Sequence, residues 1–136
     1  MKIIFIDDST IVLDTLKSLV LEMIDSKIIV CDFFTDSISI KKMIEEESLE
    51  YDLMFIDINM PIITGYDLAK TAKKIKKYKY KPIIAITSEY TSEAKEDGKK
   101  AGIDGWFIKS ITQDSLQLSI VNAIKQLYKD SGNYLK

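Results

Sequence analysis

The sequence predicts an α/β fold, a doubly wound parallel sheet of five strands that alternate with five helices. Short apolar runs without polar alternation predict strands that are buried on both faces, as in a parallel sheet. Polar segments with apolar residues at helical spacing, such as Leu16, Leu19 and Met23, separate these runs. Alternation of this kind implies right-handed βα units. A length of 136 residues fits one domain with a single sizeable core.

The elements follow from the position of each apolar run. The expected strands are residues 2–7, 27–34, 53–57, 82–87 and 105–109. The first expected helix has its N-cap at Ser9 or Asp8. The other four are residues 37–47, 66–77, 92–101 and 113–129. Gly98 should interrupt the fourth helix, which has little apolar anchoring, so we expect low local stability there.

The central strand ends on a carboxylate. Its apolar residues, 53–56, are followed directly by Asp57, and Pro61 then prevents the chain from continuing as a ladder strand. Open α/β sheets bind ligands at the carboxyl ends of their strands. Asp57 is therefore the first candidate for a functional residue.

Composition excludes several classes of protein. A net charge of −2 argues against a general nucleic-acid binder. Cys31 is the only cysteine, so no internal disulfide forms, and its apolar surroundings indicate a core residue. We expect a cytoplasmic protein without a membrane span, since no apolar run is long enough and residues 1–7 lack a signal-peptide layout. The chain has no histidine to serve as metal ligand, base or phosphate carrier.

Polar side chains stand at the carboxyl ends of four predicted strands: Asp7-Asp8, Asp57, Thr87-Ser88 and Lys109-Ser110. In a parallel sheet these ends share one edge, so the side chains should converge. Two carboxylates about 5 Å apart repel by roughly 3 kcal/mol at an effective dielectric near 20. One lysine does not offset three acids, whereas Mg²⁺ with oxygen ligands does. With the metal and Lys109 neutralising a phosphoryl group, Asp57 becomes a nucleophile that forms an acyl phosphate.

From about residue 2 to residue 129, the chain resembles the receiver domains of two-component response regulators, and its spacing is closest to the single-domain chemotaxis type. The resemblance rests on Asp7-Asp8, Asp57-x-x-Met60-Pro61-x-x-x-Gly65, Thr87 and Lys109, in this order and spacing. It implies the flavodoxin-like strand order 2-1-3-4-5. It also implies a receiver domain over residues 1–130, which leaves a C-terminal tail at 131–136.

The resemblance implies a role for each residue around the metal and the phosphoryl group. Asp57 would be the phosphoacceptor and a metal ligand. Asp8 would bind Mg²⁺, or Mn²⁺ in its place, directly, and Asp7 largely through water. The backbone carbonyl of Asn59 would be a further ligand. Lys109 would contact both Asp57 and the phosphoryl oxygens.

Further implied roles concern switching and the lifetime of the phosphoryl group. Thr87 would hydrogen-bond the phosphoryl group and move inward. Trp106, three residues before Lys109, would follow it as the switch aromatic. Asn59 and Glu89 would tune how quickly the phosphoryl group is lost.

The implied partners are proteins. A histidine kinase or histidine phosphotransfer protein would donate the phosphoryl group. Output would pass through the face formed by residues 92–101, 105–109 and 113–129, with neither nucleic acid nor membrane involved. The chain would assist its own phosphorylation and dephosphorylation without being an enzyme, as a monomer or a phosphorylation-linked dimer. Leu118, Val121 and Tyr128 lie off the main stripe of the last helix and suggest a docking or dimer surface.

Three residues depart from the family pattern. Ser110 replaces the usual proline after the lysine, where the family has a cis bond, and a non-proline cis bond costs about 3–4 kcal/mol. Ser88 replaces a small residue after Thr87, and Trp106 is bulkier than the usual tyrosine or phenylalanine. We expect phosphorylation to survive, with the amplitude of switching affected.

Two other functions stay open. A receiver-like module could bind its partner constitutively, with phosphorylation abolished by Ser88 and Ser110. A small aspartyl-nucleophile phosphatase is disfavoured, because Asn59 stands where a second acid would serve as general acid. The lysines in residues 73–81 are interpreted as a helix end and a solvated loop, with a dock for an acidic partner as the alternative.

Overall fold

The computed structural model describes residues 1–109 and 112–132 and confirms the alternation of strands and helices. The strands are β1 (Lys2–Ile6), β2 (Val30–Phe34), β3 (Leu53–Ile56), β4 (Ile83–Thr87) and β5 (Gly105–Ile108). The helices are α1 (Thr10–Asp25), α2 (Ser37–Glu45), α3 (Gly65–Lys73), α4 (Ser92–Ala101) and α5 (Gln113–Asp130).

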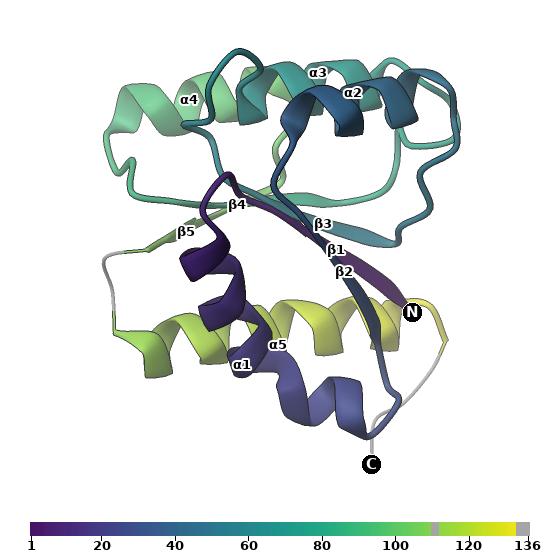
Figure 1. The fold of residues 1–136 in the computed structure, drawn as a ribbon, viewed down its shortest axis with the longest axis vertical. Helices are drawn as coiled ribbons and strands as arrows, with labels where there is room; N and C mark the ends of the chain where they lie inside the picture. The colour runs from purple at the N-terminus through teal and green to yellow at the C-terminus, as the bar shows by residue number, and fades with distance from the viewer. Residues whose placement is uncertain (110–111, 133–136) are drawn as a thin grey trace.

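All strand pairs are parallel, and the sheet has the expected order β2-β1-β3-β4-β5. Helices α2, α3 and α4 cover one face of the sheet, and α1 and α5 cover the other (Figure 1). The carboxyl ends of the strands lie toward the left of that view. Since β1, β3 and β4 are neighbours, the connections that follow them meet at one edge of the sheet.

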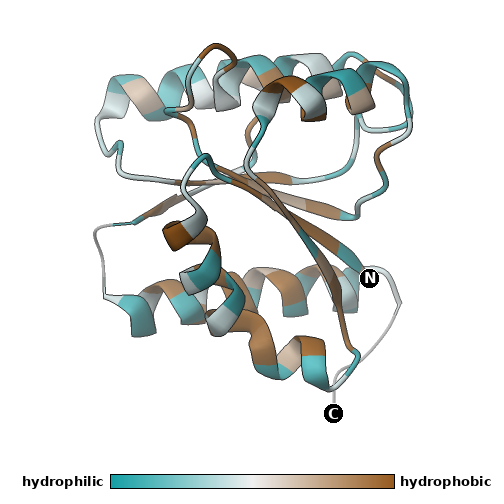
Figure 2. Cartoon of the chain, viewed as in Figure 1, coloured by the Kyte–Doolittle hydropathy of each residue, from teal (hydrophilic) through white to brown (hydrophobic). Residues whose placement is uncertain are grey.

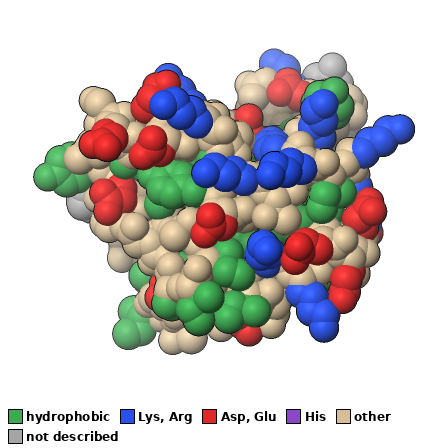
Figure 3. Space-filling view, turned by 90° about the horizontal axis from the view of Figure 1, so that it is seen from above, with side chains coloured by type: hydrophobic (Ala, Val, Ile, Leu, Met, Phe, Trp, Pro, Cys, Tyr) green, Lys and Arg blue, Asp and Glu red, His purple; other side chains and the backbone are tan. Residues whose placement is uncertain are grey.

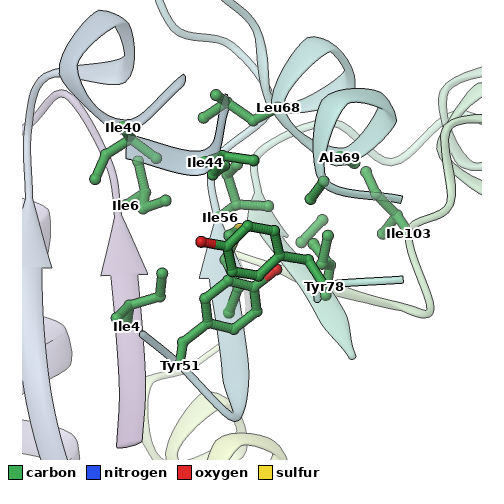
Figure 4. Close-up of a cluster of buried hydrophobic side chains, with 14 of the residues drawn as sticks. Ile4, Ile6, Ile40, Ile44, Tyr51, Ile56, Leu68, Ala69, Tyr78 and Ile103 are labelled. Carbon is green, nitrogen blue, oxygen red and sulfur yellow. The ribbon is translucent and has the colours of Figure 1, made fainter. Parts of the chain in front are cut away.

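The two faces of the sheet bury separate hydrophobic clusters. The cluster under α2, α3 and α4 includes Ile4, Ile56 and Tyr78 (Figure 4), and the cluster under α1 and α5 includes Phe5 and Phe55. Each central strand therefore contributes apolar residues to both clusters, which explains why its sequence does not alternate. Hydropathy follows the same arrangement, because the strands are mostly hydrophobic and the helices are mixed (Figure 2). No helix in the described part of the chain is long and apolar enough to cross a bilayer.

The N-cap of α1 is Ser9, whose hydroxyl accepts a hydrogen bond from the Val12 N–H at 3.3 Å. The sequence left Asp8 as the other candidate. Because Ser9 caps the helix, the exposed Asp8 carboxylate is not used as a cap and lies beside Asp7 and Asp57.

Two predicted boundaries were wrong. The strand predicted at 27–34 begins at Val30, because Lys27 has a left-handed backbone with φ of 62° and the chain turns there. The helix predicted at 66–77 ends at Lys73, and a series of turns follows in which the Tyr78 N–H donates to the Ile75 carbonyl at 2.9 Å. These turns place Tyr78 fully in the core. Burial of this ring outweighs the helical periodicity of the sequence.

Gly98 does not interrupt α4, which runs unbroken from Ser92 to Ala101. The indole of Trp106 occupies the space that a side chain at Gly98 would need, since a Cβ at Gly98 would lie 2.6 Å from the Trp106 Cζ3 atom. The expectation of weak anchoring overlooked this contact, because Trp106 comes from a different element.

The lysines between 73 and 81 are solvated only in part: Lys74, Lys76 and Lys79 are exposed, as predicted, and the other three are bound. The ammonium groups of Lys73, Lys77 and Lys81 donate to the main-chain carbonyls of Lys81, Glu47 and Tyr51 at 2.8–2.9 Å. The face covered by α2, α3 and α4 carries lysines and acids interspersed rather than one basic patch (Figure 3). These three lysines are therefore structural.

Candidate functional site

Three neighbouring strands deliver polar side chains to one edge of the sheet. Asp7 follows β1, Asp57 follows β3, and Thr87 is the last residue of β4. Their exposed fractions are 2%, 6% and 0%. Buried acidic and hydroxyl side chains at strand ends do not serve the hydrophobic core. This edge is the candidate site.

Lys109 joins the two buried acids. Its Nζ lies 2.7 Å from the Asp7 Oδ2 atom and 3.2 Å from the Asp57 Oδ2 atom. The remaining oxygens are also bound, since Asp7 Oδ1 accepts from the Ser9 N–H at 2.9 Å and Asp57 Oδ1 from the Ile58 N–H at 2.8 Å. The Asp57 carboxylate is therefore held in one orientation, with Oδ2 beside the only cation among the described residues of the site.

The charges of the site perturb one another. Burial raises the pKa of Asp57, the Asp7 charge raises it further, and the ammonium of Lys109 opposes both. Burial alone would lower the pKa of Lys109, but its bonds to Asp7 and Asp57 outweigh burial and raise it. Lys109 is thus held as a cation, while the negative charge of Asp57 is incompletely compensated.

The residues present fit a hard divalent cation. Carboxylate oxygens of Asp7, Asp8 and Asp57 lie within 4.8 Å of one another. Oxygen donors from two or three carboxylates at an accessible edge are the ligands that Mg²⁺ and Mn²⁺ take in proteins. Asp8 is exposed, so the site is open to solvent on that side.

Glu89 connects the site to β5. Its carboxylate accepts a hydrogen bond from the Asn59 amide at 2.8 Å, and its main-chain carbonyl accepts from the Trp106 indole N–H at 2.8 Å. Its own N–H donates to the Thr87 hydroxyl at 3.3 Å. A single residue therefore contacts the β3–α3 connection, the end of β4 and the aromatic of β5.

The structure brings most of the predicted site residues together. Lys109 is in direct contact with Asp7 and Asp57, and Asp8 lies beside these acids. Thr87 is joined to Lys109 through the backbone, since the Lys109 N–H donates to the Thr87 carbonyl at 2.8 Å. The bond between Lys109 and Ser110, whose cis or trans form the sequence left open, lies outside the described residues. The functional roles of all these residues stay predictions.

Sequence reasoning missed three features. It did not foresee the bond between Asn59 and Glu89, the notch at Gly98 that holds Trp106, or the conformation of Ile62. Only Ile62 left a signal in the sequence, as an apolar residue directly after Pro61 in the connection that follows β3.

Comparison with known proteins agrees with this geometry. Residues 3–121 match the response regulator receiver domain family. The chain is 25% identical over 120 residues to the chemotaxis protein CheY of Pseudomonas aeruginosa, covering 88% of this chain and 93% of that protein. It is 28% identical over 110 residues to the stress response regulator protein 1 of Candida tropicalis, covering 81% of this chain but only 40% of that protein.

A solved structure shares the fold. The receiver domain of the sensor histidine kinase PA1611 from Pseudomonas aeruginosa, which has a magnesium ion coordinated in its active-site cleft, superposes with a TM-score of 0.71 at 20% identity. The alignment covers 90% of this chain and 96% of that domain. With the family match spanning most of its length, the chain belongs to the receiver domains of two-component response regulators.

Proposed function

We propose that this receiver domain accepts a phosphoryl group on Asp57 from a phosphohistidine of a histidine kinase or phosphotransfer protein. The observation that carries the proposal is the bridge of Lys109 between Asp7 and Asp57 inside a cluster of three carboxylates. Folding alone gives no reason to bury like charges at this edge. Transfer of a phosphoryl group to Asp57 would explain the arrangement, because Lys109 and a divalent cation held by the three carboxylates would neutralise the phosphoryl oxygens.

The chain's own residues perform the transfer as an in-line displacement. The Asp57 Oδ2 atom forms a bond to phosphorus while the phosphorus–nitrogen bond of the donor breaks, and the donor imidazole keeps the electron pair. Lys109, already 3.2 Å from this oxygen, stabilises the charge that spreads over the phosphoryl oxygens. The Ile58 N–H holds Asp57 Oδ1 and so fixes which oxygen attacks.

A divalent cation belongs to the same site. Asp7, Asp8 and Asp57 would hold Mg²⁺, or Mn²⁺, together with the Asn59 carbonyl, and the ion would supply charge neutralisation for the phosphoryl oxygens. Thr87 is fully buried next to this point, and its hydroxyl accepts from Glu89, which leaves its proton available to donate to the phosphoryl group.

The output rests on the contacts of Glu89. Movement of Thr87 toward the phosphoryl group would shift Glu89, whose carbonyl holds the Trp106 indole N–H and whose carboxylate holds Asn59. Trp106 in turn fills the notch at Gly98 of α4. Phosphorylation would therefore change the face made by α4, β5 and α5, which would contact a downstream protein. The chain is an acceptor that assists its own phosphorylation and dephosphorylation and has no separate substrate.

The direct test is intact mass after incubation with Mg²⁺ and a small acyl phosphate, with Asp57→Asn as the matched control. We expect one added phosphoryl group in the natural chain and none in the variant. Trp106, the only tryptophan, reports the switch by its fluorescence in the same samples. If the chain is phosphorylated but the Trp106 fluorescence does not change, only the proposed coupling through Glu89 is contradicted, and the role of Asp57 as acceptor stands.

Absence of phosphorylation would overturn the proposal and favour a module that binds its partner constitutively. Continuous release of inorganic phosphate from simple phosphoesters would instead identify a phosphatase. Hydrogen exchange with and without a phosphoryl mimic adds an independent check, because unchanged protection from β4 to β5 would rule out the conformational change.

A further inference from the structure

Four lysines surround one hollow between the carboxyl-terminal ends of α3 and α4. The hollow has a volume of about 210 Å³, and its walls are formed by Lys70, Lys73, Lys74, Lys100, Ala101 and Gly102. No acidic residue of the described chain is among them. The whole chain has a net charge of −2, so this hollow carries the opposite charge to the molecule that contains it.

Lys73 and Gly102 join the two helices at this point. The Lys73 Nζ atom donates to the Lys81 carbonyl at 2.9 Å and to the Asp104 Oδ2 atom at 3.1 Å, which fixes the side chain. Its stem lies against Gly102, where a Cβ would come within 2.6 Å of the Lys73 Cγ atom. Gly102 has φ of 98°, so glycine serves both the left-handed turn that ends α4 and this close approach. The hollow is therefore built into the packing of α3 against α4.

The other three lysines have uncompensated charges. Lys70, Lys74 and Lys100 are exposed, and their ammonium groups form neither an ion pair nor a hydrogen bond with any described residue. A lysine near the end of a helix interacts favourably with the helix dipole, which accounts for each of these residues on its own helix. The dipole does not account for the convergence of two helix ends on one hollow that lacks an acid.

The charge and size of the hollow decide what fits it. A cleft lined by one sign of charge concentrates ions of the opposite sign, and three free ammonium groups match an anion with several negative charges. The volume equals that of about seven water molecules at roughly 30 Å³ each, and it is below the roughly 300–1,000 Å³ of pockets for drug-sized ligands. Ala101 is the only hydrophobic residue in the lining. The occupant is therefore compact and highly charged, without an apolar part that must be buried.

We propose that this hollow is a binding site for a compact polyphosphate anion, either free diphosphate or triphosphate or the phosphate chain of a nucleotide. Lysine binds phosphate oxygens as a compact point charge, and linked phosphates carry the several negative charges that the three free ammonium groups would neutralise. The site is separate from the phosphoacceptor site, because α3 begins at Gly65 beside Asp57 and the hollow lies at its other end. The inference is thus independent of the proposed function.

The experiment measures diphosphate binding by isothermal titration calorimetry at low ionic strength. Divalent cations are left out, since they would bind both the anion and the carboxylates of the phosphoacceptor site. Lys74→Gln and Lys100→Gln each remove one ammonium group of the hollow. Lys76→Gln and Lys99→Gln are the matched controls, because they change the net charge equally at exposed lysines outside the lining. Backbone amide NMR spectra of the same samples locate the bound anion.

We expect Lys74→Gln and Lys100→Gln to weaken diphosphate binding about fivefold or more, because each loses a charge-assisted contact. The two controls should weaken it less than about twofold, since solvent screens charges outside the hollow. The amide signals that shift on binding should centre on Ala101 and Gly102. Equal weakening in all four variants would overturn the proposal, because the anion would then respond to net charge alone. Shifts confined to the neighbours of Asp57 would also overturn it.

Two further comparisons define the ligand. Equal affinities for diphosphate and ADP would mean that the phosphate chain alone is recognised, whereas tighter binding of ADP at the same amides would identify a nucleotide as the source; both results support the site. Sodium sulfate at equal ionic strength is the control, and equal shifts with sulfate would reject the assignment to polyphosphate. Failure of diphosphate, triphosphate and ADP to bind would overturn the proposal, and binding of a glutamate-rich peptide instead would reassign the lysines to an acidic protein partner.

Discussion

The two ends of the sheet handle charge in opposite ways. At the amino ends of the strands, lysines bind acids and backbone carbonyls, as Lys77 does with the Glu50 carboxylate and the Glu47 carbonyl. The rings of Tyr51 and Tyr78 stack there with their centroids 5.3 Å apart (Figure 4). At the carboxyl ends, Lys109 bridges two of three clustered acids, and the hydrophobic side chains of Ile62 and Tyr90 are exposed to solvent.

This contrast shows where the fold gains its stability and where it gives some up. At the amino ends, lysines pair main-chain carbonyls that folding would otherwise leave unpaired, although the buried Tyr51 hydroxyl has no partner among the described residues. The carboxyl ends keep like charges together and hold Ile62 in a strained turn. Natural proteins violate local rules mainly at functional sites, so the difference locates function independently of any motif.

The largest effect should come from Gly65→Ala, which tests how tightly the carboxyl ends are built. Gly65 opens α3, and a Cβ there would overlap the Asp57 carbonyl oxygen and lie 3.0 Å from the Ile58 Cα. Since backbone cannot yield as a side chain can, we expect a loss of about 1–3 kcal/mol in the free energy of unfolding. Phosphorylation should also slow, because Asp57 is displaced.

Gly105→Ala is the control for this loss. A Cβ at Gly105 would meet only the Ile84 side chain, at 3.2 Å, which can adjust. Chemical denaturation should therefore show a smaller effect there. An equal loss in both variants would mean that the overlap with the Asp57 backbone costs no more than the overlap with a side chain, which contradicts the prediction.

Asp57→Asn should stabilise the protein, by about 0.5–2 kcal/mol at neutral pH, as removal of unfavourable functional groups often does. The pKa of Asp57 is raised in the folded state, by burial first and by Asp7 second, so its ionised form is disfavoured there. Stability of the natural chain should fall as pH rises above the ordinary carboxyl pKa of about 3.9, relative to the variant. Denaturant midpoints measured from pH 3 upward check this, and a constant difference would contradict it.

Magnesium should stabilise the carboxyl ends and leave the amino ends unaffected. A ligand that binds only the folded state at ten times its dissociation constant adds about 1.4 kcal/mol. We expect MgCl₂ to raise the unfolding midpoint, and Asp8→Asn to weaken the gain because it removes one of the three clustered carboxylates. Sodium chloride at equal ionic strength is the control. An equal shift with sodium would show screening instead of binding.

The smallest effects concern the two stacked tyrosines of the amino ends. The Tyr78 hydroxyl donates to the Leu49 carbonyl at 2.8 Å, whereas the buried Tyr51 hydroxyl has no partner among the described residues. Tyr78→Phe should therefore cost about 1 kcal/mol, and Tyr51→Phe should raise stability by up to about 1 kcal/mol. Thermal unfolding of the two variants, each the other's control, decides the sign. Equal losses would mean that the Tyr51 hydroxyl has a partner such as water.

Local sequence patterns predicted the fold and most members of the site. The parallel sheet and the convergence of Asp7, Asp57, Thr87 and Lys109 follow from apolar runs and from the rule that parallel strands end at one edge, whereas the strand order was implied by the family resemblance. The end of α3 was predicted wrongly, because turns that bury Tyr78 override a periodicity that continues to residue 77.

The sequence by itself determined which residues meet at the carboxyl ends, since periodicity and strand ends are local properties. Only the tertiary structure decided how they meet: the bridge of Lys109 between Asp7 and Asp57, the bond from Asn59 to Glu89, and the notch at Gly98 that holds Trp106. Each of these contacts joins separate elements, and its geometry depends on how the helices pack against the sheet. Spacing along the chain does not encode that packing.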